Sequence, residues 1–161
     1  MRIYWIDKIP NHKLGMMARP RGNDWLYDDI KKLSLHDVGV VISLLEPTEI
    51  RELGLNNEGE HCESVGIHFI NYPIEDRSLP HSQSTFNELI DTLSQKLSAG
   101  KKVVVHCRMG IGRTSMVCAA LLIRNGVDPK EVFDILSETR TFQVPDTPEQ
   151  AQWVHDFVTG Q

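Results

Sequence analysis

Unbroken runs of apolar residues alternate along the chain with segments in which apolar residues recur at helical spacing. The runs VGVVISLL (38–45) and VVVH (103–106) are rich in β-branched residues and indicate strands buried on both faces of a sheet. IHFINYPI (67–74) predicts a third strand of this sheet. Residues 2–6 and 13–18 are expected to form two shorter strands at its start.

The segments with helical spacing predict helices between these strands. Residues 24–36 read as a helix that Asp24 caps, and Pro47 near the start of PTEIREL indicates a short second helix. Residues 83–99 place their apolar side chains on one face of a longer helix. The members of that face are Phe86, Leu89, Ile90, Leu93 and Leu97.

Capping signals predict three more helices in the last third of the chain. Arg113–Asn125 is expected to be helical and to end at Gly126, the residue type that most often follows a helix. Asp128 followed by Pro129 predicts a helix that runs to about Glu138. Thr147-Pro148-x-Gln150 repeats the signature and predicts the last helix.

Strands that alternate with helices predict an α/β fold, with a central, mostly parallel, twisted sheet flanked by helices. With 161 residues and no repeat or linker, we expect one domain over residues 1–161. A net charge of −5 gives no support to nucleic-acid or membrane binding. Three cysteines without a C-x-x-C pair, and an N-terminus without a secretory h-region, favour a reducing, cytoplasmic setting. A monomer is the default expectation.

The strand at 103–106 runs into the stretch HCRMGIGRTS, which combines a cysteine, two glycines and an arginine before a helix begins. A glycine-rich turn at a helix N-terminus is a design for binding anions, because backbone N–H groups converge there. Gly110 and Gly112 permit the close turn, and Arg113 can offer two parallel hydrogen bonds to an oxyanion. Cys107 at the rim would be a thiolate that faces the bound phosphate, which makes it a nucleophile facing its electrophile.

A second cysteine tests whether spacing alone carries this prediction. Cys118 also has an arginine, Arg124, six positions later, but CAALLIR contains no glycine and consists of strong helix formers. Cys118 is therefore expected to be an inert core thiol in mid-helix. The strand, glycines and following helix, rather than the spacing, distinguish Cys107.

HCRMGIGRTS resembles the signature loop of cysteine-dependent protein phosphatases, which reads His-Cys, five residues, Arg, then Ser or Thr. The length of the chain resembles the dual-specificity group, including the cyclin-dependent-kinase-associated and related bacterial enzymes. The likeness extends over nearly the whole chain through LGMMARPRG, PIEDRSLP and a TPEQ helix. It implies hydrolysis of phosphomonoesters on protein phosphotyrosine, and also phosphoserine or phosphothreonine, without metal or cofactor.

The resemblance also implies a role for each matching residue. Cys107 attacks phosphorus, Arg113 and the amides of residues 108–113 hold the phosphate oxygens, and Thr114 steadies the thiolate. His106 orders the loop and helps depress the pKa of the cysteine, from behind rather than as a base. The phosphate-binding set is Arg108, Met109, Gly110, Ile111, Gly112 and Arg113.

A departing alkoxide or phenoxide needs a proton from a nearby acid. PIEDRSLP (73–80) follows a predicted strand, and strand ends at one edge of a parallel sheet converge on one site. By alignment with the family motif Asp76 is the acid, and in the second step the base that activates water. Glu75 is the rival carboxylate.

Two departures from the family pattern bear on function. Asp146 stands where a water-positioning glutamine would be, and Gln150 matches only a second glutamine of that segment, so its role in placing water stays open. Phosphoinositide phosphatases carry two lysines in the signature loop, where this chain has Arg108 and Ile111. One cation and one aliphatic side chain favour a monoester on a protein over a polyanionic lipid headgroup. A non-catalytic phosphate-binding module and a phosphoinositide phosphatase are the alternatives to a protein phosphatase.

Three further residues have two interpretations each. Arg19 and Arg21 could bind a second anion or be ordinary solvated charges. Cys62 could be a resolving thiol for oxidised Cys107, although an unpaired cysteine is the simpler interpretation.

Overall fold

The computed structural model describes residues 1–9 and 13–159, which contain a five-stranded sheet with the strand order β1-β2-β5-β3-β4. The expected domain 1–161 also includes residues 10–12 and 160–161, which lie outside the described residues. The strands are β1 (Tyr4–Ile6), β2 (Lys13–Ala18), β3 (Val38–Ser43), β4 (His68–Asn71) and β5 (Lys102–Cys107). The pairs β2–β5, β5–β3 and β3–β4 are parallel, and only β1 runs antiparallel to its neighbour β2. The predicted α/β fold with a mostly parallel sheet is confirmed.

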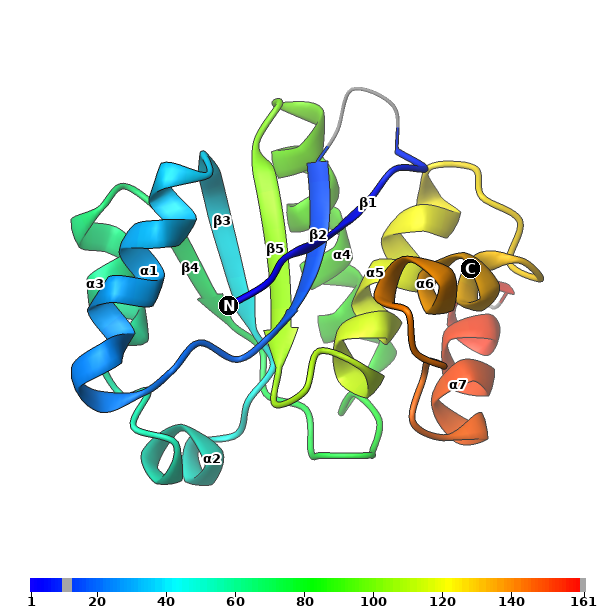
Figure 1. Cartoon of the computed structure of the whole chain (residues 1–161). Helices are drawn as coiled ribbons and strands as arrows, with labels where there is room; N and C mark the ends of the chain where they lie inside the picture. The colour runs from blue at the N-terminus through cyan, green and yellow to red at the C-terminus, as the bar shows by residue number, and fades with distance from the viewer. Residues whose placement is uncertain (10–12, 160–161) are drawn as a thin grey trace.

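Helices cover both faces of this sheet (Figure 1). The short helix η1 (Asn23–Trp25) leads into α1 (Leu26–Leu35), and α1 and α3 (Glu58–Ser64) pack over one face. The other face carries α4 (Gln83–Ser98), α5 (Gly112–Arg124), α6 (Val132–Arg140) and α7 (Pro148–Thr159). The remaining helix, α2 (Pro47–Glu52), lies beyond the end of β3, at the lower edge of the sheet in Figure 1.

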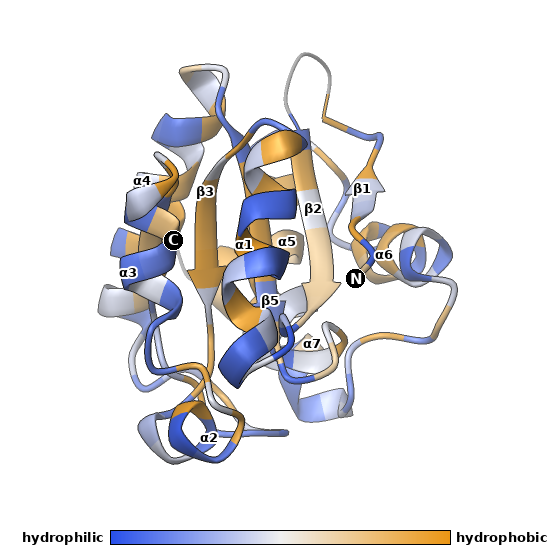
Figure 2. Cartoon of the chain, turned by 60° about the vertical axis from the view of Figure 1, so that its left-hand side comes forward, coloured by the Kyte–Doolittle hydropathy of each residue, from blue (hydrophilic) through white to orange (hydrophobic). Residues whose placement is uncertain are grey.

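Hydrophobic patterning accounts for these layers, as Figure 2 shows by the apolar strands between helices with one polar face. Val103 and Val105 face the α4–α7 layer, whereas Val104 faces the α1–α3 layer, as the alternation along a strand requires. All five apolar residues predicted for one face of α4 are buried. Helix α5 is buried almost throughout, so it is the central helix of its layer.

Two helix starts differ from the sequence expectation, and one helix was not expected. Asp24 lies inside η1 and does not cap α1, which begins after Trp25 without a side-chain cap. The Asp128 carboxylate accepts a hydrogen bond from the Lys130 N–H in a turn, and α6 begins only at Val132. Helix α3 was not predicted, because its seven residues, EGEHCES, are too short and too polar for a clear period.

Two other boundary predictions are confirmed. Gly126 follows α5 with φ +95°, a conformation that suits glycine. Thr147 and Gln150 form the predicted capping box at the start of α7. The Gln150 N–H donates to Thr147 Oγ1 at 3.2 Å, and the Thr147 N–H donates to Gln150 Oε1 at 3.3 Å.

Candidate active site

The residues of the predicted site meet at the carboxyl ends of the parallel strands β3, β4 and β5. Cys107 is the last residue of β5, and the loop 108–111 leads directly into α5. The segment after β4 lies beside it, since the Ile74 N–H donates to the Leu44 carbonyl after β3. The sheet edge thus brings together residues that lie far apart in the sequence.

The signature loop is held from outside through its carbonyl groups. Arg140 donates to the carbonyls of Met109 (2.9 Å) and Gly110 (3.2 Å), and the Arg19 N–H donates to that of Arg108 (3.2 Å). The other three carbonyls from 107 to 112 also have partners. That of Cys107 contacts the His106 ring, and those of Ile111 and Gly112 accept hydrogen bonds from the N–H and the hydroxyl of Ser115. In a trans peptide the N–H points opposite to the C=O, so the amides of residues 108–113 face the inside of the loop.

At both glycines of the loop, a larger residue would collide with a neighbouring group. Gly110 has φ +72°, and a Cβ there would collide with the main chain of Met17 in β2. A Cβ on Gly112 would collide with the carboxylate of Asp146. The residue that replaces the expected glutamine therefore lies directly against the first turn of α5.

Cys107 is almost completely buried at the base of this loop, where Thr114 donates a hydrogen bond to its Sγ at 3.0 Å. This is the contact that the family resemblance implied for Thr114. Cys118 lies in α5, one helical turn after Thr114. It is fully buried, and burial raises its pKa. The predicted contrast between the two cysteines is thus reproduced in their surroundings.

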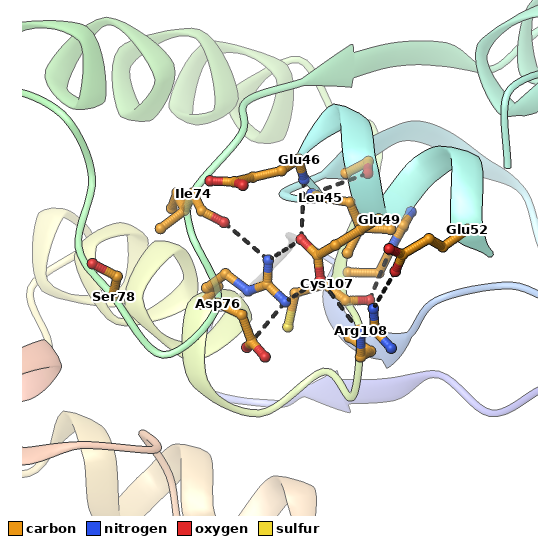
Figure 3. A network of polar contacts seen from close by, with 12 residues as sticks. Leu45, Glu46, Glu49, Glu52, Ile74, Asp76, Ser78, Cys107 and Arg108 are labelled. Atoms are coloured by element: carbon orange, nitrogen blue, oxygen red, sulfur yellow. Dashed lines mark hydrogen bonds and ion pairs between the residues drawn. The ribbon is translucent and has the colours of Figure 1, made fainter.

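Arg113 is buried to 99% and binds two carboxylates. These belong to Glu49 and Asp76, which Figure 3 labels beside Cys107. The Arg113 Nη1 and Nη2 donate to Glu49 Oε1 and Oε2 at 2.7 and 3.0 Å, and Nη2 lies 3.1 Å from Asp76 Oδ1. Nη1 also donates to the Ile74 carbonyl at 2.9 Å. The Arg113 Nε is buried but has no hydrogen-bond partner among residues 1–9 and 13–159.

Glu49, from α2, is a member of the site that sequence reasoning missed. Burial by itself raises the pKa of its carboxyl, but hydrogen bonds from Arg113 and the Glu46 N–H outweigh burial and hold the pKa below its ordinary value. Burial tends to lower the pKa of Arg113, and the hydrogen bonds to Glu49 reverse this and raise it. The pair therefore fixes a permanent cation beneath the loop. No sequence signal separates Glu49 from the other acids of EPTEIRE.

The structure brings Asp76, rather than Glu75, to the signature loop. Asp76 reaches Arg113 with a side chain that is still 54% exposed, so solvent can reach it. Glu75 is exposed and forms no ion pair with Arg113. That Asp76 rather than Glu75 is the general acid stays a prediction.

Gln150 and the two early arginines are engaged in structural contacts. The Gln150 Oε1 accepts from the N–H groups of Asp146 and Thr147, and its Nε2 donates to the Ser78 carbonyl at 3.0 Å. Gln150 thus ties α7 to the segment that carries Asp76. Arg21 is bound to the buried Asp29 at 2.7 Å and is not free for a second anion, and Arg19 supports the loop through its main chain.

Comparison with known proteins identifies the class to which this fold and site belong. Residues 15–127 match the family described as "Tc-R-P: Polymorphic toxin system, DSP-PTPase phosphatase". The chain belongs to this family of dual-specificity-like cysteine phosphatases, as its signature loop predicted.

Individual relatives share this class. Human dual specificity protein phosphatase 1 is 38% identical over 74 residues, which are 45% of this chain and 20% of that protein. Rat cyclin-dependent kinase inhibitor 3 is 26% identical over 132 residues, which are 81% of this chain and 60% of that protein. The chain thus spans less than two thirds of the curated relatives it matches.

Solved structures match over the whole length. A kinase-associated phosphatase whose catalytic-site cysteine is replaced by serine superposes with a TM-score of 0.90 at 21% identity, covering 99% of this chain and 95% of that one. PTPMT1 gives a TM-score of 0.80 at 21% identity with the same coverage. At this identity the likeness concerns the fold.

Proposed function

We propose that this protein hydrolyses phosphomonoesters on protein phosphotyrosine, and on phosphoserine or phosphothreonine, through a phosphocysteine intermediate and without a metal. The unpartnered Nε of buried Arg113 carries the proposal, because a buried donor without a partner marks a place for a missing acceptor. The amides of 108–113 face the same space, and Cys107 lies at its base. A tetrahedral oxyanion in the loop would satisfy all of these donors.

In the first step, Cys107 Sγ attacks phosphorus, the S–P bond forms and the bond to the ester oxygen breaks. Asp76 gives its proton to that oxygen, so the leaving group departs as an alcohol or phenol. Arg113 and the loop amides stabilise the charge on the equatorial oxygens. In the second step, Asp76 takes a proton from water, whose oxygen attacks phosphorus. The thiolate leaves with the hydrogen bond from Thr114 to its Sγ.

A monoester on a protein fits the loop better than a polyphosphorylated lipid headgroup. Arg108 is the cation at the rim, but its guanidinium is already engaged by Glu49 at 3.4 Å and Glu52 at 3.8 Å. Ile111 is buried and offers no charge. PTPMT1 has been crystallised with PI(5)P, so phosphoinositide hydrolysis remains the second substrate class to assay.

A test of this function is turnover of p-nitrophenyl phosphate from pH 5 to 8 in EDTA and dithiothreitol. We expect activity with a bell-shaped pH profile, absent in Cys107→Ser and retained in Cys118→Ala, the matched control at the second cysteine. Rates of hydrolysis are then compared for PI(5)P and for peptides of one sequence that carry phosphotyrosine, phosphoserine or phosphothreonine. If the wild-type protein is inactive but phosphate still protects Cys107 from alkylation, the protein is a phosphate-binding module instead.

The nucleophile also restricts where the protein can act. All three cysteines are unpaired. A thiolate nucleophile is lost on oxidation, so we place the reaction in a reducing compartment such as the cytoplasm. Within residues 1–9 and 13–159, no helix is long and apolar enough to cross a membrane.

A further inference from the structure

Behind the nucleophile, His106 contacts a buried glutamate that the sequence did not single out. His106 Nε2 lies 2.6 Å from Oε2 of Glu58, the first residue of α3. Both residues are buried, with exposures of 0% and 2%. The other ring nitrogen, Nδ1, lies 3.2 Å from the Cys107 carbonyl oxygen.

These two contacts determine how many protons the pair holds. A carbonyl oxygen only accepts hydrogen bonds, so Nδ1 must carry a hydrogen. The contact between Nε2 and Glu58 also needs a hydrogen, which belongs either to the ring or to the carboxyl. The pair is therefore either an imidazolium with a carboxylate, or a neutral imidazole with a carboxylic acid.

The surroundings favour the charged arrangement. Glu58 contacts His106, and the charges of Glu58 and Glu63 both raise the pKa of nearby Cys62. Cys107 lies on the far side of the His106 ring. Among residues 1–9 and 13–159, no lysine or arginine pairs with Glu58, so only His106 can balance its charge. A separation of 2.6 Å is typical of a charge-assisted hydrogen bond.

We propose that Glu58 is a positioning residue that holds His106 as an imidazolium behind Cys107. This inference rests on the proposed function, because it concerns the same nucleophile. The ring lies between Glu58 and the main chain of Cys107, so the positive end of the pair faces the nucleophile. The Nδ1–H polarises the Cys107 carbonyl and, through the same peptide, the Arg108 N–H that faces the loop. Both effects favour the thiolate.

The test is Glu58→Gln, which keeps the size and the hydrogen bonds of the side chain but removes its charge. Glutamine can donate to Nε2 while Nδ1–H still donates to Cys107, so a purely structural role would survive. We expect the pH midpoint of Cys107 alkylation by iodoacetamide to rise by about one unit, since a neighbouring charge shifts a titration by about 1–3 units and Glu58 offsets part of the effect. The acid limb of kcat/KM should move with it.

Glu63→Gln is the matched control, because Glu63 is an exposed acid on the same helix. Its midpoint should equal that of wild type. An unchanged midpoint in Glu58→Gln would overturn the inference. Alkylation of Cys107 needs no turnover. If the wild-type protein proved inactive but Glu58→Gln still shifted the alkylation midpoint, this inference would hold while the proposed function failed.

A measurement on the wild-type protein covers the case in which Glu58→Gln does not fold. Nitrogen-15 NMR at neutral pH distinguishes protonated from unprotonated ring nitrogens, and His106→Asn assigns the signal. We expect both nitrogens of His106 to be protonated. One unprotonated ring nitrogen would overturn the proposal.

Discussion

At the residue scale, the site is organised around the charge of Arg113. Glu49 and Asp76 reach the guanidinium from different elements, 64 and 37 positions away in the sequence. The sequence predicted Arg113 and Asp76 because they belong to recognisable motifs. Glu49 and Glu58 were not predicted, because a glutamate in a polar helix looks like a solvated charge until the fold buries it.

Glu49→Gln should weaken both the fold and the site. It leaves Arg113 buried without its carboxylate, so we expect a loss of about 1–3 kcal/mol in the free energy of unfolding at pH 7. The folded pKa of Glu49 lies below its ordinary value of 4.5, so this stabilisation is present above about pH 4.5 and is lost as the pH falls through the folded pKa. Urea denaturation from pH 7 to 3 measures the effect. A gap to wild type that stayed constant over this range would contradict the account.

Asp76→Asn should discriminate between leaving groups. Without the acid, substrates with poor leaving groups, such as alkyl phosphates, should lose about 100-fold or more in kcat/KM, and activated aryl phosphates much less. Glu75→Gln is the matched control and should behave like wild type. An equal loss for both substrate types would assign Asp76 a structural role.

The three cysteines should differ sharply towards iodoacetamide in the native protein at pH 7. Burial and the nearby charges of Glu58 and Glu63 raise the pKa of Cys62 to about 12. Cys62 also belongs to the hydrophobic cluster on the sheet face opposite that of Cys107, which argues against a resolving thiol. Peptide mapping should find label on Cys107 alone, with phosphate slowing it. Native labelling of Cys62 or Cys118 would contradict this.

At the element scale, the signature loop depends on contacts from the elements around it. Its carbonyls are held by Arg19 after β2 and Arg140 at the end of α6, and Asp146 packs against Gly112. Gln150 connects α7 to the segment that carries Asp76. The strand, glycines and helix of the loop were predictable from local sequence. Its outer support was not, because these contacts span up to 89 residues.

Gly112→Ala tests the close approach of Asp146. The new Cβ would overlap the carboxylate, and we expect a loss of about 1–3 kcal/mol in stability with lower turnover. In an Asp146→Ala background the same substitution should cost clearly less, because the overlapping group is gone. Thermal denaturation of the four proteins in this double-mutant cycle gives the coupling. Additive changes in stability would mean that residue 112 and Asp146 are not in contact.

At the scale of the whole molecule, long apolar runs made the fold predictable. Runs such as 38–45 and 103–106 marked the strands, and amphipathic or capped segments marked α4, α5 and α7. Short polar elements, including α3 and the start of α6, were missed or misplaced because tertiary contacts rather than local propensity form them. α3 nevertheless carries Glu58, and α2 carries Glu49. Helix α2 was predicted and α3 was not, but in both helices it was the buried glutamate, which supports the site electrostatically, that sequence reasoning missed.

The central claim is that Cys107 forms a covalent bond to phosphorus during turnover. Rapid acid quenching during p-nitrophenyl phosphate hydrolysis, followed by peptide mass spectrometry, tests it most directly. The account predicts a phosphorylated peptide with the phosphate on Cys107, at increased occupancy in Asp76→Asn and absent in Cys107→Ser. Phosphate on another side chain, or undiminished turnover in Cys107→Ser, would contradict it.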